Sequence, residues 1–225
     1  MLARPPSPVG RGFLFLDERG ISLVARIAFF IDGFNVYHAL VDGKLGRYKW
    51  LDYRRLSSLF VRSSDQIVDV LYFTAYTTWD TAKMERHQCY VQALRAAGVR
   101  IVLGEFKRKD KKCRVCRQTY QTFEEKKSDV NIAIKLFEGA IKDVYDTAVI
   151  MSGDSDLIPA IEAVKETFPA KQVRLVIPIG RGAEALKNAT DFHMKMKEMH
   201  LKSSQFPDVV DLGGGKSVTR PKNWK

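Results

Sequence analysis

Short apolar runs alternate with helical segments along most of this chain of 225 residues. The runs that predict strands are 26–31, 66–76, 99–103, 147–151 and 173–177. Apolar spacing predicts helices over 80–97, 128–144 and 156–168, with shorter helices at 35–41, from 52, after 182 and at 193–200. Strands separated by helices form βαβ units with parallel strands. We therefore expect an α/β fold, a three-layer α/β/α sandwich around a mostly parallel sheet of about five strands.

The composition is that of a folded domain without a membrane segment. Hydrophobic residues make up 45% of the chain, which is enough for one sizeable core. No apolar run approaches the roughly 20 residues of a membrane span. The apolar run 13–16 is followed by Asp17, Glu18 and Arg19 rather than by a cleavage site for a secretory signal. Three cysteines do not make a disulfide framework. We expect a cytoplasmic protein with no membrane partner.

Composition also suggests where the domain begins and ends. Residues 1–25 are rich in proline and have no clear period, so we expect a poorly ordered tail there. We place one domain at 26–202. The segment 203–225 is rich in glycine and lysine, and we expect a flexible basic tail.

Aspartates close two of the apolar runs. Asp32 follows the run 27–31, and Asp154 and Asp156 follow the run 147–151. The carboxyl ends of parallel strands share one edge of a sheet, where ligands bind. Carboxylates gathered there repel one another unless a cation lies between them. The sequence thus predicts a Mg²⁺ or Mn²⁺ site, although each of these aspartates taken alone is more typical of a turn or a helix N-cap.

Positive charge is concentrated in one stretch. The chain has 37 Lys and Arg against 26 Asp and Glu, a net charge of +11, and 107–127 carries +6 of it. We expect an inserted basic hairpin at 105–123 that contacts the phosphates of a polyanionic partner, although a basic run is also typical of a solvated surface. Arg181, after the strand at 173–177, is a further candidate for a phosphate contact. The hairpin candidates are Lys107, Arg108, Lys109, Lys111, Lys112, Arg114 and Arg117.

Cys113 and Cys116 lie inside the basic hairpin with the spacing of half a zinc site. A tetrahedral site needs two further ligands, which a second copy in a homodimer could supply. A tight turn with reduced thiols and a redox role are the alternatives. The four histidines show no ligand spacing.

Three segments together resemble the signature of NYN domains, which are PIN-like ribonucleases, in the bacterial branch described as LabA-like or DUF88. The segments are Phe30-Ile31-Asp32-Gly33-Phe34-Asn35, Glu125-Lys126-Lys127-Ser128-Asp129-Val130 and Ser152-Gly153-Asp154-Ser155-Asp156-Leu157. The resemblance covers roughly 26–200. It implies a PIN-like, Rossmann-like sandwich and an acidic Mg²⁺ or Mn²⁺ site that cleaves RNA.

The resemblance assigns roles to the residues that match these three motifs. The acidic metal ligands would be Asp32, Asp129, Asp154 and Asp156, and Asn35 would orient substrate or a metal-bound water. Ser152 could hydrogen-bond a ligand carboxylate or phosphate, or shape the turn.

Two other functions compete with a nuclease. A phosphatase of the haloacid-dehalogenase type needs a second aspartate two residues after the first, and this chain has Phe34 there. An RNA-binding regulatory module with a silent site keeps the same acids, so a cleavage assay must separate it from a nuclease.

Overall fold

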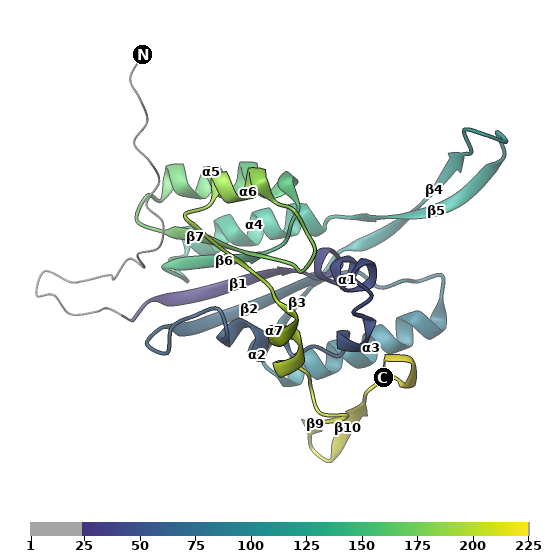
Figure 1. Ribbon diagram of the computed structural model, residues 1–225, viewed down its shortest axis with the longest axis horizontal. Helices are drawn as coiled ribbons and strands as arrows, with labels where there is room; N and C mark the ends of the chain where they lie inside the picture. Colours follow the sequence, from purple (N-terminus) through teal and green to yellow (C-terminus); the bar gives the residue numbers. More distant parts are fainter. Residues whose placement is uncertain (1–23, 225) are drawn as a thin grey trace, which may run out of the picture.

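A six-stranded parallel sheet forms the centre of the computed structural model, which describes residues 24–224 (Figure 1). The order across the sheet is β3-β2-β1-β6-β7-β8, and every neighbouring pair is parallel. The strands are β1 (Arg26–Asp32), β2 (Gln66–Thr74), β3 (Arg100–Leu103), β6 (Thr147–Met151), β7 (Gln172–Ile177) and β8 (Phe192–Lys195). The expected α/β sandwich with a parallel sheet is confirmed.

One expected helix is a strand in part. We predicted a helix at 193–200, but β8 occupies Phe192–Lys195 and only α7 (Glu198–Ser203) is helical. β8 pairs along β7, with Leu175 opposite His193 and Ile177 opposite Lys195. The segment Phe192–Lys195 mixes apolar and polar residues and lacks the apolar run that predicted the equally short β3, so pairing with β7 decides this structure. The sheet has six strands for this reason.

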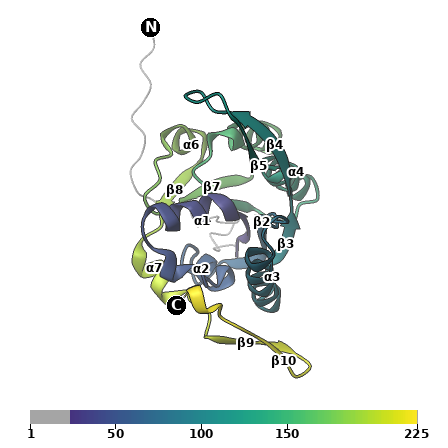
Figure 2. The same ribbon diagram turned by 90° about the vertical axis from the view of Figure 1, so that its right-hand side faces the viewer.

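Helices cover both faces of the sheet (Figures 1 and 2). Alternate side chains of β1 point to opposite faces, with Phe29 in one core and Phe30 in the other. The core around Phe29 lies under α1 (Gly33–Asp42), α2 (Tyr53–Ser58), α3 (Thr81–Ala96) and α7, and the core around Phe30 lies under α4 (Ser128–Ile141), α5 (Ile158–Thr167) and α6 (Glu184–Ala189). Short 3-10 turns are η1 (Gly46–Tyr48), η2 (Ser155–Leu157) and η3 (Lys222–Trp224).

A long hairpin leaves the body of the molecule between β3 and α4 (Figure 1). Its strands, β4 (Glu105–Lys112) and β5 (Thr119–Lys126), pair antiparallel from Glu105 opposite Lys126 to Lys112 opposite Thr119. At its base, a Cβ on Gly104 would lie 2.8 Å from the Lys126 carbonyl oxygen. Glycine therefore lets the start of the hairpin approach its end closely.

The segment after residue 203 is folded, which corrects our expectation of a flexible tail. It forms a second hairpin of β9 (Val209–Gly213) and β10 (Lys216–Thr219), followed by η3. The Trp224 ring lies 5.5 Å from that of Tyr90 and 6.3 Å from that of Trp50. The Trp50 indole also donates to the Pro207 carbonyl at 2.8 Å. Aromatic packing and this hydrogen bond hold a segment whose composition suggested disorder.

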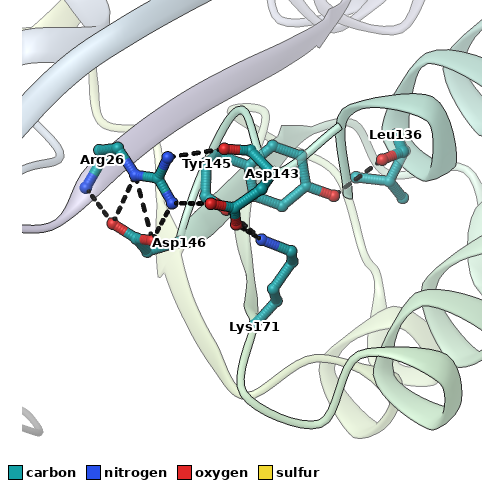
Figure 3. Close-up of polar contacts among 6 residues, drawn as sticks. All are labelled: Arg26, Leu136, Asp143, Tyr145, Asp146 and Lys171. Atoms are coloured by element: carbon teal, nitrogen blue, oxygen red, sulfur yellow. Dashed lines mark hydrogen bonds and ion pairs between the residues drawn. The ribbon is translucent and has the colours of Figure 1, made fainter. Parts of the chain in front are cut away.

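The amino edge of the sheet is held by a polar cluster (Figure 3). The Arg26 guanidinium binds Asp146 at 2.6 Å and Asp143 at 2.9 Å. Lys171 donates to Asp143 at 2.6 Å, and the Tyr145 hydroxyl donates to the Leu136 carbonyl at 2.8 Å. These contacts join β1 to the start of β6 and lie at the edge opposite Asp32, so their role is structural.

Among residues 24–224, no helix is long and apolar enough to cross a membrane. The poorly ordered tail predicted for residues 1–25 falls outside the described residues except at its last two positions.

Candidate functional site

Asp32 ends β1 and begins α1 at the carboxyl edge of the sheet. It is the N-cap of the helix, since one carboxylate oxygen accepts from the Asn35 backbone N–H at 3.0 Å. The side chain is buried at 6% exposure. A Cβ at Gly33 would lie 2.5 Å from the Tyr72 ring, so only glycine fits after Asp32. The turn thus fixes the carboxylate in place.

The loop after β6 reaches the same carboxylate. The buried Ser152 hydroxyl donates to the second oxygen of Asp32 at 2.8 Å and accepts from the Asp154 backbone N–H at 3.1 Å. Asp154 in turn caps η2, because its side chain accepts from the Asp156 N–H at 3.0 Å. Ser152 therefore links the two strand-end motifs.

Asn35 joins these motifs a second time. Its side-chain carbonyl accepts from the Gly153 backbone N–H at 2.9 Å. Gly153 is also close to Arg181, because a Cβ on this glycine would lie 3.3 Å from the Arg181 Cβ. Asn35 thus holds the loop after β6 against α1, which is a positioning role.

Asp129, in the first turn of α4, completes the acidic cluster. Burial raises its pKa, and the charges of Asp32, Asp154 and Asp156 raise it further. The pKa of Asp32 is also raised, first by burial and also by Asp154, although hydrogen bonds from Asn35 and Ser152 oppose this. Asp129 therefore lies within electrostatic range of the other three predicted aspartates, and Asp32 lies within range of Asp154.

Glu125 is a fifth acid at this edge, and the sequence motifs did not single it out as a site residue. It lies near the end of β5 and accepts a hydrogen bond from the Ser128 hydroxyl. Burial raises its pKa to about 7, and Asp32 and Asp129 contribute. Glu125 is the first residue of the second sequence motif, but only the fold shows that it lies near Asp32.

The acidic side chains of the described residues are not arranged as the ligands of a metal ion. Within residues 24–224, no group of three or more His, Cys, Asp or Glu side chains stands in an arrangement that could hold a metal ion. The fit to a cation therefore rests on the chemistry of the donors. Carboxylate oxygens are the ligands that Mg²⁺ prefers, and Mg²⁺ keeps several waters, so a few aspartates suffice.

The cations predicted to bind RNA divide into paired and unpaired groups along the hairpin. Lys109 and Lys111 contact Glu124 at 3.1 and 3.0 Å, which lowers the pKa of that glutamate to about 2. Lys107 lies 3.5 Å from Glu105. Exposed positions without an ion pair to another described residue are Arg108, Lys112, Arg114 and Arg117. Figure 1 shows the hairpin extending well beyond the sheet.

Arg181 lies beside the acidic edge but is engaged by a neighbour. Its guanidinium contacts Asp42, at the end of α1, at 2.9 Å. The contact neutralises part of its charge, so a phosphate would have to compete with Asp42 for this arginine.

Cys113 and Cys116 lie at the tip of the basic hairpin, far from the other described cysteine in sequence. Backbone N–H groups of Cys116 and Val115 point at the Cys113 thiol and lower its pKa. Arg117, the next residue, has a left-handed backbone with φ of 57°. In the part of the chain that the structure describes, no third ligand joins the two thiols. Zinc binding and the homodimer that would complete it stay predictions.

A cavity of about 640 Å³ opens next to the acidic cluster, between α1, α3 and the base of the hairpin. Its walls are largely aromatic, with three cations and one acid, Glu125. The C-terminal residues Asn223 and Trp224 also line it. Sequence reasoning missed this cavity because its walls come from segments separated by as much as 190 positions.

This chain is similar to a known family, to a named protein and to a solved structure. The family model of the NYN domain matches residues 26–197. The chain is similar to 6-hydroxy-3-succinoylpyridine 3-monooxygenase HspA of Pseudomonas putida, with 25% identity over 239 residues, covering 88% of this chain and 75% of that protein. A crystal structure of a protein of unknown function from Vibrio parahaemolyticus has a TM-score of 0.56 and 18% identity, covering 81% of this chain and 97% of that one. This last likeness concerns the fold alone.

Proposed function

The chain belongs to the NYN domain family, the PIN-like ribonuclease group, and from this premise we propose that it is a divalent-metal-dependent ribonuclease. The observation that carries the proposal is the electrostatic coupling of Asp129 to Asp32, Asp154 and Asp156. Burial and repulsion from neighbouring aspartates raise the pKa of Asp129 and of Asp32, and a bound cation would relieve both effects.

The four aspartates would hold Mg²⁺ or Mn²⁺ at the carboxyl edge. A divalent ion bound by carboxylates supplies an activated water and stabilises the charge that develops as a phosphodiester bond breaks. Ser152 orients Asp32 through its 2.8 Å hydrogen bond, and Asn35 fixes the loop that carries Asp154. The basic hairpin would hold the phosphates of the strand with a salt-sensitive affinity. In this proposal the protein acts on RNA in the cytoplasm.

The test compares cleavage by matched variants. Wild-type protein is incubated with single-stranded and structured RNA in Mg²⁺ or Mn²⁺, and again with a chelator. We expect cleavage that the chelator stops and that Asp32→Asn and Asp154→Asn abolish, while RNA binding survives. Asp65→Asn, at the amino edge of the sheet next to β2, is the matched control and should cleave as wild type does.

The same assay separates the alternatives. RNA binding without cleavage in any divalent ion would contradict the nuclease and support a regulatory RNA-binding module. Hydrolysis of small phosphomonoesters in place of RNA would support a phosphatase.

A second candidate function is action on a small aromatic compound. The Pseudomonas putida relative is named for 6-hydroxy-3-succinoylpyridine, and the cavity of about 640 Å³ is the observation that favours such a ligand here. Ligand sites of this size are typically apolar with a few polar groups. Calorimetric binding of 6-hydroxy-3-succinoylpyridine to wild type, with Tyr37→Ala as the cavity variant, tests this candidate. No heat of binding would remove it.

A further inference from the structure

We propose that the cavity beside the acidic edge binds an unstacked nucleobase of single-stranded RNA, with the neighbouring phosphate held at the aspartates. The inference rests on the proposed ribonuclease function and adds to it the form of the substrate. It assigns a ligand to the cavity that the catalytic acids alone do not require.

One face of α1 lines the cavity. Phe34, Tyr37 and His38 are spaced i, i+3 and i+4, so their side chains lie together on that face. Tyr37 is 41% exposed, so its ring is not part of the core. The Lys49 ammonium lies 4.9 Å from the centre of the Tyr37 ring. An exposed aromatic ring with an adjacent cation is the kind of platform on which bases stack.

The hairpin supplies the facing aromatic rings. Phe106 meets Phe34 edge to face at 5.3 Å, and both line the cavity. Phe123 also lines it and is stacked on Trp79, with ring centres 3.6 Å apart and planes 7° apart. The basic hairpin therefore carries two of the aromatic rings that line the cavity, Phe106 and Phe123. A strand bound along the hairpin would bring its bases to these rings.

The cavity adjoins the acidic cluster, although none of the four aspartates lines it. Gly33 and Phe34 line the cavity and directly follow Asp32 in the β1–α1 turn. Glu125 lines it too and interacts electrostatically with Asp32 and Asp129. A group in the cavity and a group at the aspartates are thus neighbours, as the base and the phosphate of one nucleotide are.

The acids at one end of the cavity disfavour an aromatic acid whose carboxylate would lie at that end. Glu125 and the aspartates repel a carboxylate at the end where the cavity meets the cluster. A nucleobase is uncharged and avoids this repulsion. Lys49, Lys83 and Arg86 on the walls would offset the charge of the flanking phosphates. The His87 ring is hydrogen-bonded with the Thr74 hydroxyl at 3.1 Å and also lines the cavity, where it offers a polar group to the edge of the base.

The experiment measures binding of two RNAs to protein that does not cut them. In the Asp154→Asn background, affinity is measured for a five-nucleotide single strand and for the same sugar–phosphate chain without bases. Base stacking on aromatic rings should make the abasic chain bind roughly 5- to 100-fold more weakly. Tyr37→Ala should weaken binding of the intact strand alone, and Tyr37→Phe should restore it. Phe192→Ala, an exposed ring on β8, should change neither affinity.

Three results would overturn the inference, and they differ in what they say of the nuclease. Equal affinity for both chains, with cleavage by wild type, contradicts the base site and leaves the ribonuclease standing. A preference for the intact strand that survives Tyr37→Ala places the bases elsewhere. Binding of 6-hydroxy-3-succinoylpyridine that depends on Tyr37, with no RNA binding or cleavage, contradicts both proposals.

Discussion

Asp32 is buried, which disfavours the charged form of its carboxyl group. It is 6% exposed, yet its carboxylate accepts hydrogen bonds from Asn35 and Ser152 that favour the ionised form. The strand-end rule was sufficient to place Asp32 near Asp154 from the sequence. The rule places the ends of strands and not the side-chain hydrogen bonds between them, so it could not predict that Ser152 donates to Asp32.

Removing the Ser152 hydroxyl should weaken the site without unfolding the protein. Ser152→Ala leaves one oxygen of Asp32 without its donor, and the loss of such an outer hydrogen bond typically costs about 10- to 100-fold in metal affinity or activity. Titration with Mn²⁺ and the rate of RNA cleavage measure this effect. Ser57→Ala is the matched control, since Ser57 is equally buried and its hydroxyl has no partner among the described residues. Equal losses in both variants would contradict a specific role for Ser152.

Glu125 should make stability depend on pH in the absence of metal. Its pKa in the folded protein is about 7 against an ordinary value of 4.5, so between these values only the folded state keeps the proton. Stability should therefore fall as pH rises from about 4.5 to about 7. Urea unfolding in the presence of a chelator should show a smaller fall for Glu125→Gln than for wild type. The same fall in both proteins would contradict the raised pKa.

At the scale of elements, prediction from the sequence depended on how clear the apolar pattern was. The long helices at 81–96 and 128–141 repeat their pattern several times, and the buried strands are apolar runs. β8 was missed because Phe192–Lys195 mixes apolar and polar residues, whereas the equally short β3 is mostly apolar. The folded segment after 203 was missed because its stability comes from Trp224 against Trp50 and Tyr90, packing that composition does not reveal.

The basic hairpin should act through charge. Arg114 and Arg117 have no ion pair with another described residue, so both are available for phosphates. Replacing both with glutamine should weaken RNA binding and reduce the slope of log affinity against log salt by roughly 0.7 for each phosphate that is no longer neutralised. Fluorescence anisotropy over a salt series measures the slope. Lys142→Gln with Lys202→Gln is the control pair on other elements, and an equal change in its slope would show a non-specific charge effect.

At the scale of the whole molecule, positive and negative charges lie in different regions. The chain carries a net charge of +11, much of it on the hairpin, while the carboxyl edge of the sheet gathers five acids. A polyanion attracted by the basic hairpin is brought to the acidic edge of the sheet. A cation must be bound to the carboxylates there before the polyanion can bind. The aromatic cavity lies where the two regions meet. This arrangement supports the proposed RNA substrate better than the acids do alone.

The most direct test of this account is to locate a divalent ion in crystals of the protein grown with Mn²⁺. An anomalous difference map shows manganese independently of any assumption about its ligands. The account predicts a peak bounded by Asp32, Asp129, Asp154 and Asp156 that is lost in Asp154→Asn. A map with no peak at this edge at saturating Mn²⁺, or with a peak only at the hairpin cysteines, would contradict it.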